Sequence, residues 1–274
     1  MRHKYQIKLI SDSTGETLDR IFLALKSQFS NFDCEKKEYV FVRTEQQIIK
    51  IIKEGENEKN VIILYTIVET KLAKFISQIT EKKNIPCFGI LGNLILNFSK
   101  LLNQKANHTP SAQHVLDGDY YKRIEAIQFS MAHDDGMRTE DIEIADIILL
   151  GVSRTSKTPT SIYLANRGFK TLNIPLVTGN EIPDILKDKQ KNFCIIGLTV
   201  EPDRLSDIRS NRLEIMKEVS IPNYSNLDFI KKEIENSKKL FIKYNWPIID
   251  VTRKSVEETA ATVIRIYDIK NKQK

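Results

Sequence analysis

Residues 145–165 read ADIILLGVSRTSKTPTSIYLA. The apolar run Ile147–Leu150 has the length and composition of a buried strand, and a polar segment separates it from a predicted helix at Thr160–Asn166. A buried strand that runs directly into a helix is the repeating unit of α/β proteins, whose strands are mostly parallel. This stretch therefore predicts an α/β fold built on a parallel sheet.

The polar segment, GVSRTSKT, is close to the phosphate-binding pattern G-x-x-x-x-G-K-[ST]. In such a loop, backbone N–H groups bind phosphate oxygens, while Lys157 supplies a positive charge and the Thr158 hydroxyl suits Mg²⁺. Ser156 stands in the place of the second glycine, and Pro159 suits the first turn of a helix. An ordinary strand–helix turn rich in capping residues is the alternative. The residues predicted to bind nucleotide phosphates are Gly151, Val152, Ser153, Arg154, Thr155, Ser156, Lys157 and Thr158.

Strand and helix patterns alternate along the whole chain. Helices are predicted at Asp119–Met131 and after a capping box formed by Ser255 and Glu258. Turn-rich segments near residue 140 indicate a domain boundary there, and no internal repeat is visible. We expect two α/β units, a Rossmann-like parallel sheet in residues 1–140 and a C-terminal parallel sheet like that of P-loop kinases in residues 141–274. The predicted strands are Tyr5–Ile10, Glu38–Val42, Val61–Tyr65, Cys87–Leu91, Ala145–Leu150, Thr171–Ile174, Asn192–Leu198 and Pro247–Val251.

The composition is that of a globular protein, with 41% apolar and 28% charged residues among 274. The three cysteines are isolated, which argues against a structural zinc site and favours a reducing cytosol. No apolar run approaches the roughly 20 residues of a membrane span, and the first residues lack a secretory signal, so we expect a cytoplasmic protein without membrane contact. The net charge of +6 is spread evenly, so no nucleic-acid partner is expected.

A second loop of similar type, Ser11–Thr17 (SDSTGET), follows the first predicted strand. It places hydroxyl groups and a glycine before a helix N-terminus, where the helix dipole favours an anion. Since Ser, Asp and Thr are also common helix caps, simple capping is the alternative.

Two more clusters suit phosphoryl transfer. Arg204, Arg209 and Arg212 could bind phosphate through their guanidinium groups, or could lie on a solvated helix paired with Asp side chains. Asp250 ends an apolar run where phosphate-loop enzymes often hold Mg²⁺, or it could cap the next loop.

Asp134 and Asp135 follow His133 in a turn-rich segment. A carboxylate can orient a substrate hydroxyl and accept its proton, so Asp135 is a candidate catalytic base beside the candidate cation Lys157. An ordinary polar turn is the alternative. His108, His114 and His133 lack the spacing of metal ligands, so no metal-ligating residues are assigned.

Together these segments resemble the bacterial and plastid regulatory proteins of pyruvate, phosphate dikinase and of phosphoenolpyruvate synthase. The family also carries serine at the position of Ser156. The resemblance runs in family order from residue 11 to residue 261 and rests on SDSTGET (11–17), YKRIEAI (121–127), HDDG (133–136), ADIILLGVSRTSKTPTSIYLA (145–165), PLV (175–177), GLTVEPDRLSDIRSNR (197–212) and WPIIDVTRKSVEETAA (246–261).

The resemblance implies a bifunctional serine/threonine kinase and phosphorylase. ADP would donate its β-phosphoryl group to an active-site threonine of the dikinase in its phosphohistidine form. Inorganic phosphate would later remove that group as pyrophosphate. The resemblance further implies the loop at 151–158 as the nucleotide site, the dikinase or the synthase as protein substrate, and a homodimer; Mg²⁺ is also expected. Both subfamilies share the motifs, so the target stays open, and a non-enzymatic nucleotide or phosphate sensor and a plain small-molecule kinase are the other candidates.

Overall fold

The computed structural model describes residues 4–55, 58–114, 116–137, 139–177, 181–188, 192–216 and 223–272. The chain divides into two compact units, Met1–Val115 and Leu116–Lys274. Sequence analysis placed the boundary near residue 140. The division lies earlier because helix α5 (Gly118–Ala132) packs against α6 (Lys157–Ala165) and β6 (Thr171–Pro175) of the second unit.

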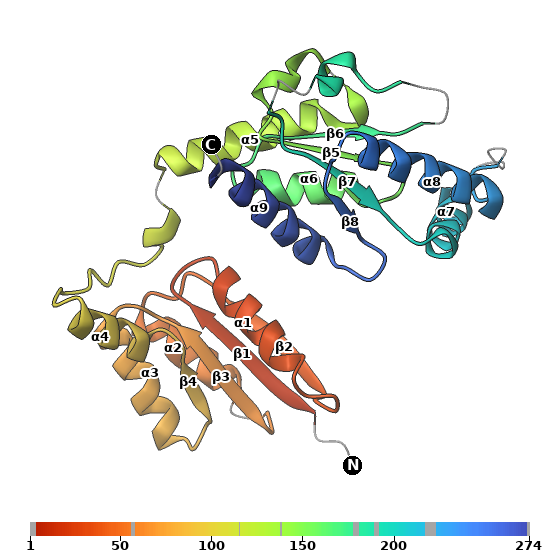
Figure 1. The fold of residues 1–274 in the computed structure, drawn as a ribbon. Helices are drawn as coiled ribbons and strands as arrows, with labels where there is room; N and C mark the ends of the chain where they lie inside the picture. The colour runs from red at the N-terminus through yellow and green to blue at the C-terminus, as the bar shows by residue number, and fades with distance from the viewer. Residues whose placement is uncertain are drawn as a thin grey trace. The chain divides into compact units, whose positions relative to one another are not determined.

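The first unit is an α/β layer structure (Figure 1). Its described strands form a four-stranded parallel sheet in the order β2-β1-β3-β4. Its elements are β1 (Tyr5–Ser11), α1 (Glu16–Lys26), β2 (Cys34–Tyr39), α2 (Glu45–Glu54), β3 (Val61–Thr66), α3 (Thr70–Lys82), β4 (Cys87–Gly89), α4 (Gly92–Leu101) and the short η1 (Ala112–His114).

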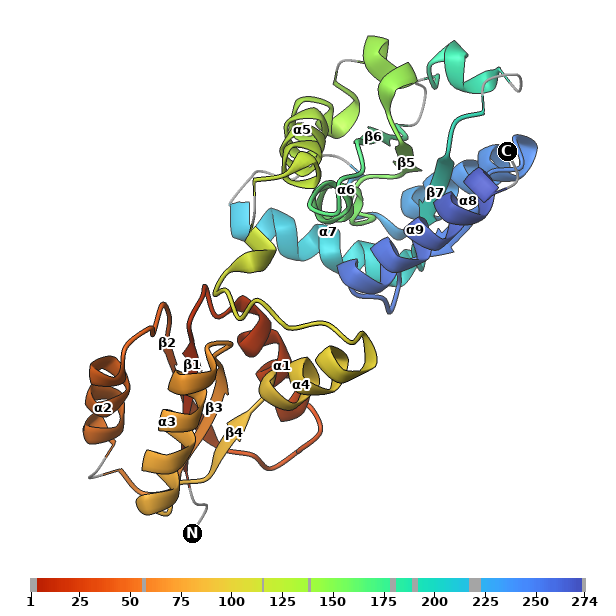
Figure 2. The ribbon, with the colours of Figure 1, turned by 90° about the vertical axis from the view of Figure 1, so that its left-hand side faces the viewer.

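The second unit repeats this plan. Its described strands form a four-stranded parallel sheet in the order β6-β5-β7-β8 (Figure 1). In both sheets the order is second, first, third and fourth strand of the unit, and Figure 2 shows β5, β6 and β7 from another side. The prediction of an α/β fold with two parallel sheets is therefore confirmed. The remaining elements are η2 (Asp134–Gly136), η3 (Thr139–Ile144), β5 (Ile147–Gly151), η4 (Asp184–Lys187), β7 (Ile195–Thr199), α7 (Pro202–Met216), α8 (Leu227–Lys243), β8 (Ile248–Asp250) and α9 (Val256–Lys272).

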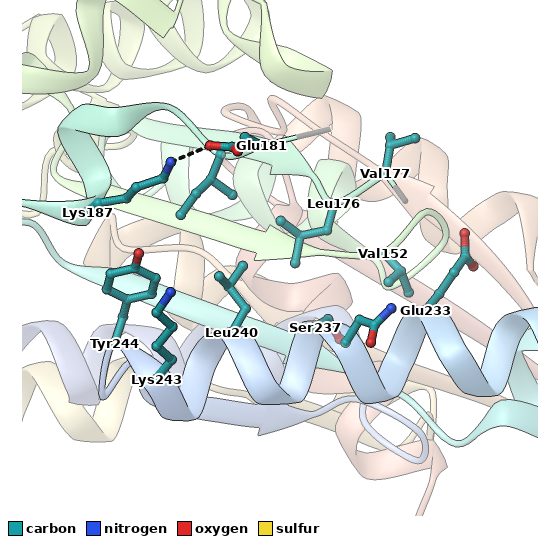
Figure 3. Close-up of a pocket in the computed structure, with 12 residues that line it drawn as sticks. Val152, Leu176, Val177, Glu181, Lys187, Glu233, Ser237, Leu240, Lys243 and Tyr244 are labelled. Atoms are coloured by element: carbon teal, nitrogen blue, oxygen red, sulfur yellow. Dashed lines mark hydrogen bonds and ion pairs between the residues drawn. The ribbon is translucent and has the colours of Figure 1, made fainter. Parts of the chain in front are cut away.

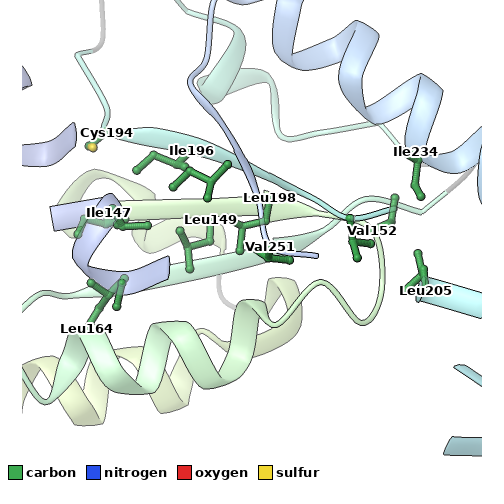
Figure 4. Close-up of a cluster of buried hydrophobic side chains, with 14 of the residues drawn as sticks. Ile147, Leu149, Val152, Leu164, Cys194, Ile196, Leu198, Leu205, Ile234 and Val251 are labelled. Atoms are coloured by element: carbon green, nitrogen blue, oxygen red, sulfur yellow. The ribbon is translucent and has the colours of Figure 1, made fainter. Parts of the chain in front are cut away.

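Burial of the second sheet on both faces fixes the position of its strands. Alternate residues of β5 point to opposite faces, so Ile147 and Leu149 join one apolar cluster while Ile148 and Leu150 join another. Figure 4 shows the first cluster, in which β5 and β7 residues pack with Leu164 of α6. The continuous apolar run that predicted this strand reflects burial on both faces.

Local signals also define several element ends. Ser255 and Glu258 form the predicted capping box of α9, with reciprocal hydrogen bonds of 3.1 and 2.8 Å. The predicted strand Glu38–Val42 was wrong in position, because the structure places β2 at Cys34–Tyr39. In the described parts of the chain, no helix combines the length and the apolar character that a membrane crossing requires.

Candidate functional site

The loop at residues 151–158 (the 151–158 loop) lies at the carboxyl end of β5, where the connections of the second sheet change direction. From β5 the chain passes through α6 to β6 on one side, and it later returns to β7 on the other side. In open parallel sheets, ligands bind outside the carboxyl ends of the strands at such a switch point. The loop also leads into the N-terminus of α6, where unpaired N–H groups and the helix dipole favour an anion.

The backbone of the 151–158 loop turns tightly. A Cβ atom on Gly151 would lie 2.8 Å from the carbonyl oxygen of Leu198, so the close approach of β7 requires glycine. Arg154 and Ser156 have φ values of 72° and 58°, in the left-handed region that favours glycine. Ser156 thus adopts a conformation for which glycine is the usual residue, at a cost of about 1–2 kcal/mol.

Lys157 is the cation of the loop, and only 5% of its surface is exposed. Its ammonium donates to the carbonyl oxygen of Val152 at 3.0 Å, and the buried Thr155 hydroxyl donates to the same oxygen at 2.9 Å. Burial lowers the pKa of Lys157 to about 8, although Asp135 and Asp134 act in the opposite direction. A bound phosphate would favour the charged amine, so anion binding and protonation of Lys157 are coupled.

Two carboxylates lie against this loop. Asp134 Oδ1 accepts a hydrogen bond from the Thr158 hydroxyl at 3.0 Å and another from the side-chain amide of Asn173. The backbone N–H of Asp135 donates to Asn173 Oδ1 at 3.0 Å. Asn173, fully buried on β6, therefore positions both residues. Sequence analysis missed Asn173, although an amide in the middle of the strand TLNIP is a readable signal.

These residues surround a cavity of about 550 Å³. Asp134 is held by two donors, whereas the Asp135 side chain is exposed at the cavity wall. Gly151, Val152 and Thr155 are buried within the loop and do not contribute to this wall. The structure thus places the predicted Lys157 and Asp135 around one space. The described residues that line it are Asp134, Asp135, Ser153, Arg154, Ser156, Lys157, Thr158, Pro159 and Ile208.

Arg209 connects α7 to the loop. Its guanidinium is buried and donates to Glu233 at 2.8 Å, to the carbonyl oxygen of Tyr224 at 3.0 Å and to that of Ser153 at 3.2 Å. The side chain therefore supports the 151–158 loop from behind and is engaged by protein groups. Arg204 and Arg212, the other members of the predicted arginine cluster, are exposed.

Asp250 and His133 are occupied elsewhere. Asp250 Oδ1 accepts from the backbone N–H and the hydroxyl of Thr252, at 2.9 and 2.5 Å, so it caps the loop after β8. The buried His133 stacks on Phe129 and contacts Asp141 through Nε2 at 3.0 Å. Within the described residues, no group of three or more His, Cys, Asp or Glu side chains is arranged to hold a metal ion, and the His114 side chain lies outside them.

The second candidate loop, residues 11–17, belongs to the first unit. The side chains of Ser11, Asp12 and Ser13 are buried, and Asp12 Oδ2 accepts from the backbone N–H of Val68 at 2.7 Å. Gly15, with a φ of 82°, is the N-cap of α1, and no side chain caps that helix. Asp12 therefore joins the ends of β1 and β3, which differs from the helix-capping alternative.

Comparison with known proteins identifies the family. A family model described as kinase/pyrophosphorylase matches residues 7–264. The chain belongs to the kinase/pyrophosphorylase family. A relative from Pelagibacter ubique is 64% identical over 269 residues, which cover 98% of each chain. Relatives from Erythrobacter litoralis and Bartonella bacilliformis are 43% and 42% identical over 265 and 262 residues, covering 97% and 96% of this chain and 95% and 93% of theirs.

All three relatives carry the name "Putative pyruvate, phosphate dikinase regulatory protein". The resemblance stated from the sequence motifs is thus confirmed at the level of the kinase/pyrophosphorylase family. Kinase chemistry needs a cradle for phosphate and a group that handles the proton of the acceptor. The 151–158 loop and Asp135 are the candidate residues for these two tasks in this member of the kinase/pyrophosphorylase family.

Proposed function

We propose that this protein is a bifunctional serine/threonine kinase and phosphorylase that regulates pyruvate, phosphate dikinase. Family membership and the names of the three relatives support this target and class of reaction. One observation carries the choice of site: a buried Lys157 shares a cavity with the exposed carboxylate of Asp135 at the N-terminus of α6. In this arrangement Lys157 can bind phosphate, and Asp135 can accept the proton of a substrate hydroxyl.

In the forward reaction, a threonine hydroxyl oxygen of the dikinase attacks the β-phosphorus of ADP. The bond from that phosphorus to the bridging oxygen breaks and AMP leaves, while the hydroxyl proton passes to the carboxylate of Asp135. Lys157 and the N–H groups at the start of α6 stabilise the negative charge on the transferring phosphoryl group. Since Lys157 is shielded from water, its charge acts more strongly there than it would at the surface.

In the reverse reaction, an oxygen of inorganic phosphate attacks the phosphorus of the phosphothreonine. The bond from phosphorus to the threonine oxygen breaks, pyrophosphate forms, and Asp135 returns a proton to the threonine. The attacking phosphate occupies the place of the ADP phosphates. One site therefore serves both directions, because both move a phosphoryl group between the loop and the same hydroxyl.

The residues around the cavity also suit Mg²⁺, which prefers oxygen ligands and usually binds through one or two carboxylates together with phosphates and water. The Thr158 hydroxyl and the Asp134 carboxylate lie within hydrogen-bond distance of each other at the cavity wall. These two residues would hold the ion. When bound, it would neutralise charge on the phosphate oxygens.

The proposal includes a homodimer, supported by an apolar surface of the first unit. Helix α4 buries none of its residues, and its Leu94, Phe98 and Leu101 side chains are more than half exposed. Exposed apolar surface of this kind is typical of an interface between proteins. Phe98→Glu should convert the dimer to a monomer in sedimentation analysis, and an unchanged dimer would place the interface elsewhere. We further propose a cytoplasmic setting; none of the three cysteines forms a disulfide in the structure.

The direct experiment supplies the purified protein with ADP labelled in the β-phosphate and the phosphohistidine form of the dikinase. Label should appear on a dikinase threonine, and addition of inorganic phosphate should release it as pyrophosphate. Lys157→Ala should lose both reactions. A parallel incubation with phosphoenolpyruvate synthase tests the alternative target. Nucleotide binding without transfer to either protein would support a sensor in place of an enzyme.

A further inference from the structure

A second cavity of about 370 Å³ lies beside the 151–158 loop in the second unit. It is bounded by α8, by η4 and by the chain that follows β6 (Figure 3). Its apolar lining includes Leu176 and Leu240, and its polar lining includes Asn236 and Ser237. The volume falls within the range of about 300–1,000 Å³ that is typical of small-molecule sites.

Consecutive residues of the loop line the two cavities. Ser153 lines the cavity that contains Lys157, and Val152 lines the second cavity. Their Cα atoms are about 3.8 Å apart, as in any pair of neighbouring residues. Glu233 strengthens the connection, because it lines the second cavity and accepts from Arg209, which in turn donates to Ser153. The two cavities therefore begin beside each other on the loop, which is the placement that one ligand occupying both would need.

The lining residues on α8 follow one another away from the loop. Glu233, Ser237 and Leu240, with Tyr244 just after the helix, recur at intervals of three or four residues along one face, which Figure 3 shows from the Val152 end to the Tyr244 end. The rise from residue 233 to residue 240 is about 10 Å, enough for a ribose followed by a base. From the loop outward, the groups are the phosphate site, the Glu233 carboxylate, and then a slot that mixes apolar side chains with polar and charged ones, Lys187 and Lys243 among them.

This order matches a nucleoside diphosphate. The Glu233 carboxylate suits ribose hydroxyl donors, and the aliphatic side chains of Leu176 and Leu240 suit the flat faces of a base. The Ser237 hydroxyl is buried and donates to the carbonyl oxygen of Ile234 at 2.8 Å, so its oxygen can still accept from an amino group on the base edge. Inorganic phosphate and pyrophosphate have no group that would enter this space.

We propose that the cavity between α8 and η4 is the nucleoside subsite, which binds the ribose and base of the diphosphate whose phosphates bind at the 151–158 loop. The inference rests on the proposed function and deepens it, because it separates the two directions of the reaction. The forward substrate uses both cavities, whereas inorganic phosphate uses the loop alone. The nucleoside subsite therefore governs the Michaelis constant for ADP without governing that for inorganic phosphate.

The test uses a substitution at an exposed position of α8 that fills part of the nucleoside subsite. Asn236→Trp places a large ring in the cavity from a residue whose own side chain is exposed, so the core of the unit is left intact. Ile242→Trp is the matched control, because Ile242 is 71% exposed on the same helix and does not line the cavity. Calorimetry measures the affinity of each purified full-length protein for ADP and for pyrophosphate.

Wild type and Ile242→Trp should bind ADP at least about tenfold more tightly than pyrophosphate, and Asn236→Trp should lose this preference while keeping its affinity for pyrophosphate. In the activity assay, Asn236→Trp should raise the Michaelis constant for ADP by a similar factor and leave that for inorganic phosphate unchanged. Equal binding of the two ligands by wild type, no binding of either, or a preference retained in Asn236→Trp would overturn the subsite. Failure of phosphate transfer to the dikinase would overturn the proposed function alone, since the binding preference does not depend on transfer.

Discussion

The Lys157 ammonium and the Val152 carbonyl oxygen lie 3.0 Å apart within one loop. The cation is therefore oriented by the same backbone that turns toward the phosphate cavity. Because Lys157 is buried, its positive charge lowers the stability of the folded protein. Because Lys157 begins α6, the same charge can bind an anion at the helix N-terminus. Stability and activity should consequently respond in opposite directions when this side chain is changed.

Lys157→Met removes the charge and keeps much of the side-chain volume. We expect phosphate transfer to fall by about 10²- to 10³-fold, the usual effect of deleting one preorganised charge contact. The free energy of unfolding at pH 7 should rise by about 2 kcal/mol, because the buried amine no longer has to be charged. Transfer assays and urea unfolding measure the two effects. Lys231→Met, an exposed position on α8, is the control, and full activity in Lys157→Met would contradict the assigned role.

The pH dependence of stability offers an independent check. The pKa of Lys157 is about 8 in the folded protein and 10.5 in the unfolded chain, so the unfolded chain binds more protons between these values. The free energy of unfolding contributed by Lys157 must then rise with pH across that window. The stability advantage of Lys157→Met over wild type should shrink between pH 8 and about pH 10 and stay constant below pH 7. Denaturant titrations at several pH values measure it, and an advantage that grows with pH would disprove the lowered pKa.

Replacement of Asp135 by asparagine and replacement of Asp134 by asparagine should have different effects. Asp135→Asn should reduce transfer by about 10²- to 10⁴-fold with little change in ADP affinity, because only the proton acceptor is lost. Asp134→Asn should reduce stability by about 1–3 kcal/mol, since the Thr158 hydroxyl and the Asn173 amide both donate to that carboxylate, and it should raise the Mg²⁺ concentration that transfer requires. Single-turnover assays and thermal unfolding separate the two variants. Unchanged rates of both reactions in Asp135→Asn would remove it as the base.

Substitution of Arg209 tests whether its side chain supports the 151–158 loop. Arg209→Met leaves the partly buried Glu233 carboxylate and the Ser153 carbonyl oxygen without this donor, so we expect a loss of about 3 kcal/mol in the free energy of unfolding. The Michaelis constants for ADP and inorganic phosphate should both rise, because the loop serves both. Exposed Arg212→Met should change stability by less than about 0.5 kcal/mol. A similar loss in the two variants would contradict the supporting role of Arg209.

The sequence predicted the parts of the site whose residues lie close together in the chain. An apolar strand, a polar loop and a helix follow one another at residues 147–165, so their order alone positions Lys157 and Thr158. The polar segment containing Asp135 was also recognised, and the fold brings it to the same cavity.

The missed features depend on contacts between distant segments. The amide of Asn173 is visible in its strand and Arg209 was predicted to bind phosphate, but the partners of both side chains lie far away in the chain, and single-sequence patterns do not encode those contacts. The predicted position of strand β2 was wrong because this strand lies at the edge of its sheet. Its sequence, CEKKEY, carries charges in place of an apolar pattern. The predicted boundary near residue 140 lay too late, because helix α5 belongs with α6 and β6, which follow it in the chain and against which it packs.

The shared strand order of the two sheets gives each unit its own switch point. In both sheets the first strand lies between the second and the third, so the loop that follows it opens where the connections go to opposite sides. Residues 11–17 and 151–158 occupy this same place in their own units, but only the second loop has a lysine. The backbone therefore supplies an equivalent loop position in each unit, and the residues of each loop decide its chemistry.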